Sequence, residues 1–153
     1  MNTYPQITTL RKIRQFTLAT IDGLSEAQFN QTPEGFNNNI IWNVAHMVAA
    51  EQGVCYLRAG LRTVVEKDFY NAYKPGAKPE KHIAMEAINE IKSLLLASLE
   101  KLEHDLQENI FGEYSPWSTR YGVEIGNIHQ ALSFLPFHEG MHLGYIIALK
   151  RLI

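Results

Sequence analysis

The residues best suited to chemistry in this chain are two histidines near its C-terminus, in the pentapeptide His138-Glu139-Gly140-Met141-His142. On a helix, residues four apart share one face, with their Cβ atoms about 5 to 6 Å apart. Two imidazoles placed in this way can bind the same divalent metal ion. The pentapeptide therefore predicts a metal site, and the third ligand decides which kind.

The pattern H-E-x-x-H is also that of zinc proteases, in which the histidines bind zinc and the glutamate is the general base. Those proteases take a third ligand from downstream, either a histidine six residues after the second one or an acidic residue on a following helix. Here Ala148 occupies the histidine position, and residues 143–153 contain no Asp, Glu, His or Cys. The sequence also shows no edge strand on which an extended peptide could lie. Both observations disfavour a protease.

A third ligand must then come from upstream, where the chain has four other histidines. His82 and His104 lie off the apolar stripe of their predicted helix, so we expect them to face solvent. His129 precedes His138 by nine residues, which places it on the opposite side of a straight helix at about 100° per residue. His46 is the central polar residue of the most apolar helix, where a buried imidazole needs a partner for each ring nitrogen. We therefore predict His46 as the third ligand.

Three histidines from two helices, without an evident fourth protein ligand, describe an open site whose remaining position takes water or substrate. Small residues on the same side of the helix as His46, namely Ala49, Ala50 and Gly53, leave space beside it. Such a site is typical of catalysis rather than of structure. The spacing alone equally allows three core histidines that hold no metal.

The elements that must position these residues are all predicted to be helices. The first begins near Thr3 as its cap, has Pro5 in its first turn, and carries the apolar stripe Ile7, Leu10, Ile13 and Phe16. The second follows Asn38 or Asn39 as a cap, covers residues 40–59 and ends at Gly60. The third, residues 84–106, has the clearest periodicity, with apolar residues three and four apart.

The last helix begins near Asn127 and contains Pro136, which should bend it one short step before His138. Between the helices we expect a polar connection over residues 25–38, a crossover over 61–81 with one short helical turn, and an irregular segment over 108–124. No segment shows the apolar period of two that would predict a β-strand in place of these helices. The sequence predicts an all-α, single-domain protein over residues 1–153, a four-helix bundle with long crossover connections.

The amino-acid composition indicates which classes of partner the protein binds. A formal net charge of -2 without long charged runs disfavours nucleic acid and a membrane surface, and favours a small-molecule substrate. The N-terminus does not resemble a signal peptide, and no stretch approaches the roughly 18 apolar residues of a membrane span, so we expect a cytoplasmic protein. The single cysteine, Cys55, excludes an internal disulfide and is predicted to be a buried apolar residue.

Three segments together carry a resemblance to a known family: LSEAQF at residues 24–29, NNNIIWNVAH at 37–46, and HEGMHLGYI at 138–146. Their order and spacing resemble the DinB/YfiT-like superfamily over nearly the whole chain. The resemblance implies a four-helix bundle, often a homodimer, with nickel, zinc or a similar ion on three histidines, here His46, His138 and His142. Tyr145 departs from the pattern, because many relatives have glutamine there.

Characterised members of that superfamily are mostly S-transferases that join a low-molecular-weight thiol to an electrophile, and the resemblance implies the same reaction here. A metal-dependent hydrolase and a non-catalytic binding module whose metal ties two helices together are the alternatives. Glu139 is the base available to either reaction, although a solvent-facing or supporting carboxylate is the simpler interpretation. The pocket would be lined by five residues: Trp42, Tyr145, Trp117, Arg120 and Tyr121.

Overall fold

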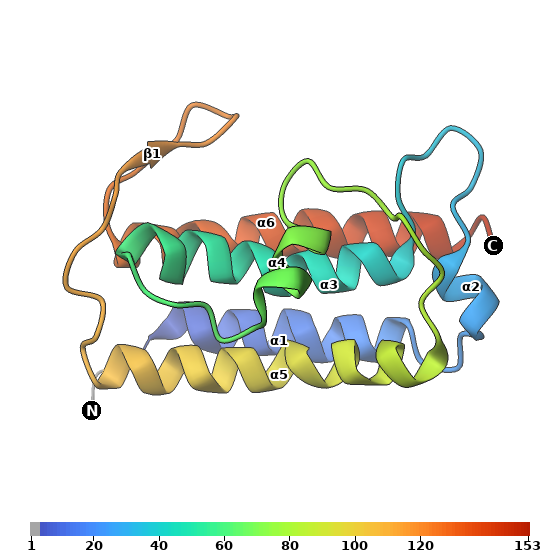
Figure 1. The fold of residues 1–153 in the computed structure, drawn as a ribbon, viewed down its shortest axis with the longest axis horizontal. Coiled ribbons are helices and arrows are strands. Elements are labelled where there is room, and N and C mark those ends of the chain that lie inside the picture. The colour runs from blue at the N-terminus through green and yellow to red at the C-terminus, as the bar shows by residue number, and fades with distance from the viewer. Residues whose placement is uncertain (1–3) are drawn as a thin grey trace.

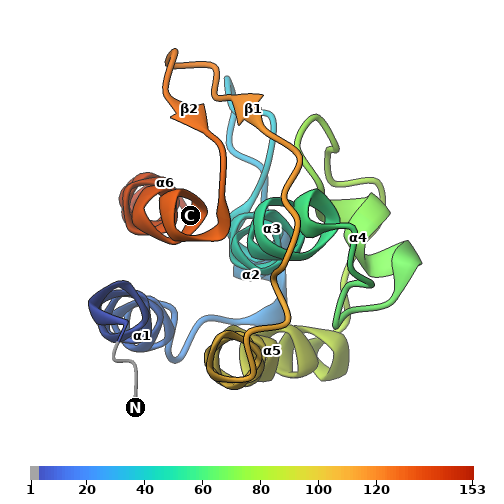
Figure 2. The same cartoon turned by 90° about the vertical axis from the view of Figure 1, so that its left-hand side faces the viewer.

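The structure is a computed structural model that describes residues 4–153. Four long helices lie side by side as a bundle: α1 (Pro5–Thr20), α3 (Ile40–Glu51), α5 (Met85–Gln107) and α6 (Ile128–Lys150). Seen end-on, they occupy the corners of a square in which α1 neighbours α5 and α6, and α3 neighbours the same two helices (Figure 2). The predicted all-α bundle is confirmed.

The bundle contains a long crossover. Helices α3 and α5 run in the same direction, so the chain between them returns along the length of the bundle (Figure 1). This return carries the short helix α4 (Lys67–Tyr73), which packs beside α3 and corresponds to the helical turn predicted within residues 61–81. It covers a side of α3 that α5 and α6 leave open.

Helix α1 departs from its predicted stripe. It starts after Tyr4 with Pro5 in its first turn, while the predicted cap Thr3 lies outside the described residues. Ile7 and Leu10 are buried, but Phe16 is 58% exposed, so its place in the stripe was wrong. Arg14 and Thr17 occupy the buried face instead, at the fourth and seventh positions after Leu10.

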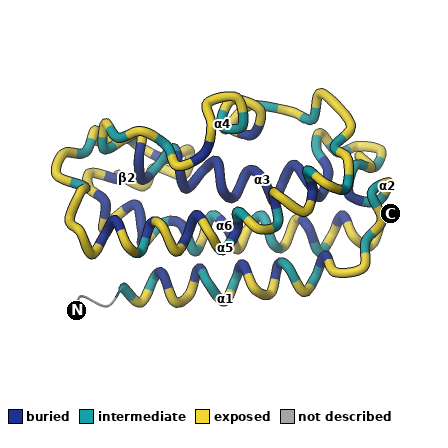
Figure 3. The backbone as a smooth tube through the Cα atoms, turned by 60° about the horizontal axis from the view of Figure 1, so that its bottom comes forward, coloured by how far each residue is buried: buried dark blue, intermediate teal, exposed yellow. Residues whose placement is uncertain are grey.

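Helix α3 is the buried centre of the molecule, and all twelve of its residues are buried (Figure 3). Asn39 caps it, since its side-chain oxygen accepts a hydrogen bond of 2.9 Å from the backbone N–H of Trp42. The predicted helix over residues 40–59 has the right extent. Its last part, however, is a π-helix (Gln52–Tyr56) followed by a 3₁₀ turn (Leu57–Ala59), which ends at Gly60 with a positive φ of 68°.

Two connections hold structure that the sequence interpretation missed. The predicted polar connection 25–38 contains the helix α2 (Glu26–Asn30), which Ser25 and Gln28 stabilise as a capping box. The segment before α6 forms a small antiparallel hairpin of β1 (Trp117–Ser118) and β2 (Glu124–Ile125), whose turn includes Gly122. This hairpin rises beside α3 and α6 (Figure 2).

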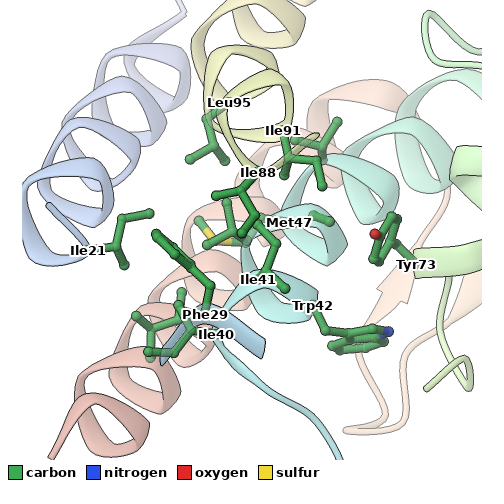
Figure 4. Close-up of a cluster of buried hydrophobic side chains, with 14 of the residues drawn as sticks. Ile21, Phe29, Ile40, Ile41, Trp42, Met47, Tyr73, Ile88, Ile91 and Leu95 are labelled. Atoms are coloured by element: carbon green, nitrogen blue, oxygen red, sulfur yellow. The ribbon is translucent and has the colours of Figure 1, made fainter. Parts of the chain in front are cut away.

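The core consists of two apolar clusters, one towards each end of the bundle. The first gathers residues from α2, nearly all of α3, the start of α5 and the end of α6. Figure 4 shows it, with Ile21 and Phe29 on one side of α3 and Trp42 and Tyr73 on the other. The second gathers residues from the start of α1, the π-helix, the second half of α5 and the first half of α6. Helix α6 spans both and continues through Pro136. No helix within the described residues is long and apolar enough to cross a membrane.

Candidate metal centre

Three histidines meet between α3 and α6. His46 lies near the middle of α3, while His138 and His142 lie one turn apart on α6. One ring nitrogen of each lies within 4.8 Å of the other two, as the convergence of three ligands on one ion requires. The other histidines, His82, His104 and His129, are exposed, as the sequence predicts for the first two.

Hydrogen bonds fix the orientation of two of the rings. The Nδ1 atom of His46 lies 2.6 Å from the carbonyl oxygen of Tyr73, on α4. The Nδ1 atom of His142 lies 2.8 Å from Oδ1 of Asn43, and the Asn43 amide nitrogen donates to Asn38 and Asn39. Because both acceptors are oxygens, each Nδ1 carries the proton, and each Nε2 keeps a lone pair free for a metal.

His138 provides the test of whether the site fits a metal. Its Nδ1 atom is buried and has no hydrogen-bond partner among the described residues. A buried polar atom without a partner costs about 1 to 3 kcal/mol, and a metal ion bound to this nitrogen would remove that cost. Three neutral imidazoles are also a donor set that zinc and nickel accept. The residues therefore fit a divalent metal.

The electrostatics keep these histidines neutral. Burial lowers the pKa of His46 below its ordinary value. Burial and the neighbouring His46 lower the pKa of His138 to about 4, and burial with both neighbouring histidines lowers that of His142 to about 3. Neutral rings have the lone pairs that metal binding requires.

Trp42 supports His46 from the side. The two rings stack with centroids 4.6 Å apart and an interplanar angle of 11°. Trp42 lies one turn before His46 on α3, and both are buried. The stack, together with the Tyr73 carbonyl, leaves the His46 ring little rotational freedom.

A cavity of about 790 Å³ opens onto the three histidines. Trp42 lines it from α3, and the hairpin segment contributes Trp117, Arg120 and Tyr121, so four of the five expected pocket residues are part of its wall. Tyr145, the fifth, does not line this cavity, and its ring packs edge-on against Phe36. Among the described residues, no aspartate or glutamate lines the cavity.

The model of the DinB superfamily matches residues 9–146. The chain belongs to the DinB superfamily. The match includes the three histidines and most of every long helix of the bundle, in agreement with the resemblance noted in the sequence. No curated protein matches the chain.

In this DinB-superfamily chain, Glu139 points away from the cavity although it follows His138 directly. Its carboxylate is buried and accepts hydrogen bonds from Arg14, with Nε 3.1 Å from both oxygens and Nη2 2.5 Å from Oε1. Glu139 is 0% exposed, so the solvent-facing alternative was wrong. The predicted role of general base has no support in this geometry, because Glu139 does not line the cavity. Burial raises the pKa of Glu139, while the pairing with Arg14 opposes that rise.

Arg14 connects Glu139 to a layer of polar groups across the middle of the bundle. Its Nη2 atom lies 2.8 Å from Oε2 of Glu51, and its Nη1 atom donates to Oγ of Ser98 at 3.0 Å. Each of the four long helices contributes one member of this layer, which lies between the two apolar clusters. Burial alone lowers the pKa of Arg14, but the two carboxylates raise it above its ordinary value, so Arg14 stays charged.

The sequence interpretation missed this layer and the two groups that orient the histidines. Arg14 shares a helical face with Ile7 and Leu10, and this position on an apolar stripe was the available signal. Nothing in the sequence showed that Asn43 faces His142 or that the Tyr73 carbonyl reaches His46. These contacts join residues far apart in the chain.

Proposed function

We propose that this protein is a metal-dependent enzyme in which His46, His138 and His142 hold a nickel or zinc ion. The observation that carries the proposal is the cavity beside three converging, neutral imidazoles with no fourth protein ligand among the described residues. A metal that only joined helices would need a closed shell of protein ligands, whereas three ligands leave a position for a small molecule.

We propose further that the reaction is the transfer of a low-molecular-weight thiol to a small electrophile, as the family resemblance implies. When bound, a divalent ion lowers the pKa of a coordinated thiol, so that sulfur is a nucleophile at neutral pH. In an addition to an activated double bond, a sulfur–carbon bond forms and the proton lost by the thiol ends on the product. Both this addition and hydrolysis need a proton transfer, so the family resemblance, and not the lining of the cavity, favours the thiol transfer.

The chain's own residues orient and enclose the reactants. The Tyr73 carbonyl and Asn43 hold the Nδ1 protons of His46 and His142, so that the opposite nitrogens face the site. The aromatic residues Trp42, Trp117 and Tyr121 provide flat apolar walls that bind carbon skeletons and displace water.

Two further parts of the proposal come from the resemblance and the composition. We propose that the protein is a homodimer and that it works in the cytoplasm. The buried free thiol of Cys55 suits a reducing compartment. Light scattering on the purified protein tests the dimer directly, because a monomer mass at micromolar concentration would contradict it.

Metal analysis after mild purification, followed by thermal unfolding with a series of small thiols, tests the function. We expect about one metal ion per chain and a higher melting temperature with at least one thiol. His46→Ala and His142→Ala should each abolish tight metal binding while the helical circular dichroism remains. His104→Ala, in which an exposed histidine is removed, is the matched control and should keep the metal. Full metal occupancy in either site variant would contradict the ligand assignment, and metal retention without any thiol effect would favour the non-catalytic module.

A further inference from the structure

The cavity beside the three histidines has a cationic wall. Arg58 and Arg120 are the charged residues among the described residues that line it, apart from the histidines, which are neutral. The protein as a whole carries a formal net charge of -2, so this positive charge is a local property of the cavity. A cavity that presents two guanidinium groups and no carboxylate attracts anions.

Neither guanidinium is neutralised by a carboxylate within the described residues, although other arginines of the chain are. Arg11 pairs with Glu103, and Arg14 pairs with Glu51 and Glu139. Arg58 and Arg120 belong to no such pair in the part of the chain that the structure describes. Their N–H donors are therefore available to a ligand.

Both arginines are exposed, and an aromatic ring of the hairpin segment lies against each guanidinium group. The central carbon of Arg58 lies 5.2 Å from the ring centroid of Trp117, and that of Arg120 lies 5.3 Å from the ring centroid of Tyr121. A guanidinium group held against an aromatic ring keeps its N–H edge free for a carboxylate, which it can bind through two parallel hydrogen bonds.

The same aromatic rings connect the arginines to the histidine end of the cavity. The Trp117 ring packs edge-on against Phe134, which in turn lies 5.9 Å from the His138 ring. The Tyr121 ring packs against Phe137, and its hydroxyl lies 3.3 Å from the sulfur of Met141, next to His142. The arginines and the histidines thus line one cavity and are connected through packed aromatic rings.

We propose that this cavity selects a small organic carboxylate, whose anionic group binds Arg58 and Arg120 while its carbon skeleton lies along Trp117 towards the three histidines. The inference rests on the proposed function for the position of the reacting end, and it specifies the class of molecule that the site accepts. The two arginines are specificity residues, because they recognise the substrate's charge rather than take part in the bond change.

A pair of probes that differ in charge tests this inference. The carboxylate 3-phenylpropionate and its neutral amide have nearly the same shape, and binding can be followed by tryptophan fluorescence because both tryptophans of the chain line the cavity. With the zinc-loaded protein we expect the carboxylate to bind at least roughly tenfold more tightly than the amide, as a charge-assisted hydrogen bond implies. Phenyl phosphate, as a third probe, distinguishes the two anions that a guanidinium group can bind through parallel hydrogen bonds, and tighter binding than that of the carboxylate would overturn the assignment to carboxylates.

Three variants show which residues produce the preference for the carboxylate over the amide. Arg58→Gln and Arg120→Gln should each weaken carboxylate binding by roughly tenfold and leave amide binding unchanged. Arg62→Gln removes the same charge from an exposed position outside the cavity lining and should change neither. Equal affinity for the two probes, or an equal loss in Arg62→Gln, would overturn the inference.

The metal-free protein separates this inference from the proposed function. If the arginines bind the carboxylate, its preference over the amide persists without metal and still depends on Arg58 and Arg120. Carboxylate binding that needs zinc but is unaffected by both arginine variants would mean direct coordination to the metal, and would overturn the inference. A protein that binds no metal yet shows the arginine-dependent preference would contradict the proposed function alone.

Discussion

At the scale of single residues, the pentapeptide on α6 serves two different environments. His138 and His142 face the cavity, while Glu139, between them, points into the bundle and pairs with Arg14. A step of about 100° per residue on a helix separates these two directions. The motif that in zinc proteases supplies ligands and base here supplies two candidate ligands and a buried ion pair.

The residue that holds the polar layer together is Arg14, because it is the cation shared by Glu51 and Glu139. Arg14→Met should lower the free energy of unfolding at pH 7 by about 3 to 5 kcal/mol, since it leaves two buried carboxylates without their partner. Urea unfolding measures this loss.

Arg11→Met is the matched control on the same helix. Arg11 pairs with Glu103 in a bridge whose side chains are about one-third exposed, so its loss should cost less than about 1 kcal/mol. Similar losses in the two variants would show that the buried layer contributes no more than a surface ion pair.

At the scale of elements, periodicity and capping residues predicted the four long helices well. Asn39 caps α3 as expected, and the apolar residues of α5 that recur from Ile88 to Leu106 are buried. The sequence could not show where α3 changes to a π-helix at Gln52, because the residue types there are compatible with either helix. The hairpin pairs only two residues on each side, which is too short to produce an alternating pattern.

The candidate site was predictable to a similar degree. The three histidines could be chosen from their spacing and from the apolar surroundings of His46, since both are local properties of the sequence. The partners of those histidines, Asn43 and the Tyr73 carbonyl, depend on how α4 and α6 pack on α3. Packing of this kind is a tertiary property that a single sequence does not display.

The cap of α3 is a test of how an element supports the site. Asn39→Ala removes the side-chain bond to the Trp42 N–H and a second bond to the Asn30 carbonyl, and should lower the free energy of unfolding by about 1 to 2 kcal/mol. Asn37→Ala, two residues earlier at an exposed position, should change it by less than about 0.5 kcal/mol. Thermal and urea unfolding of both variants check this, and equal effects would contradict the cap.

At the scale of the whole molecule, the polar layer divides the core, and the histidines join the two helices that border the cavity. A ligand that binds only the folded protein stabilises it by mass action, here by linking α3 to α6 through His46 and the α6 pair. Zinc at a hundred times its dissociation constant should therefore raise the free energy of unfolding by about 2.7 kcal/mol. His142→Ala should lose most of this increment, whereas His104→Ala should keep it.

Proton binding by the same histidines makes the stability of the metal-free protein depend on pH. His138 and His142 have pKa values of about 4 and 3 in the folded state, below the ordinary histidine value of 6.5. Protons therefore bind the unfolded chain more tightly, so these two residues should make the metal-free protein lose stability as pH falls from about 6.5 towards 4. Urea unfolding of the wild type and of a His138→Ala, His142→Ala double variant at pH 7 and pH 5 measures this contribution. The double variant should lose less stability between the two pH values, because it lacks both depressed groups, and an equal loss would mean that these histidines are not buried neutral in solution.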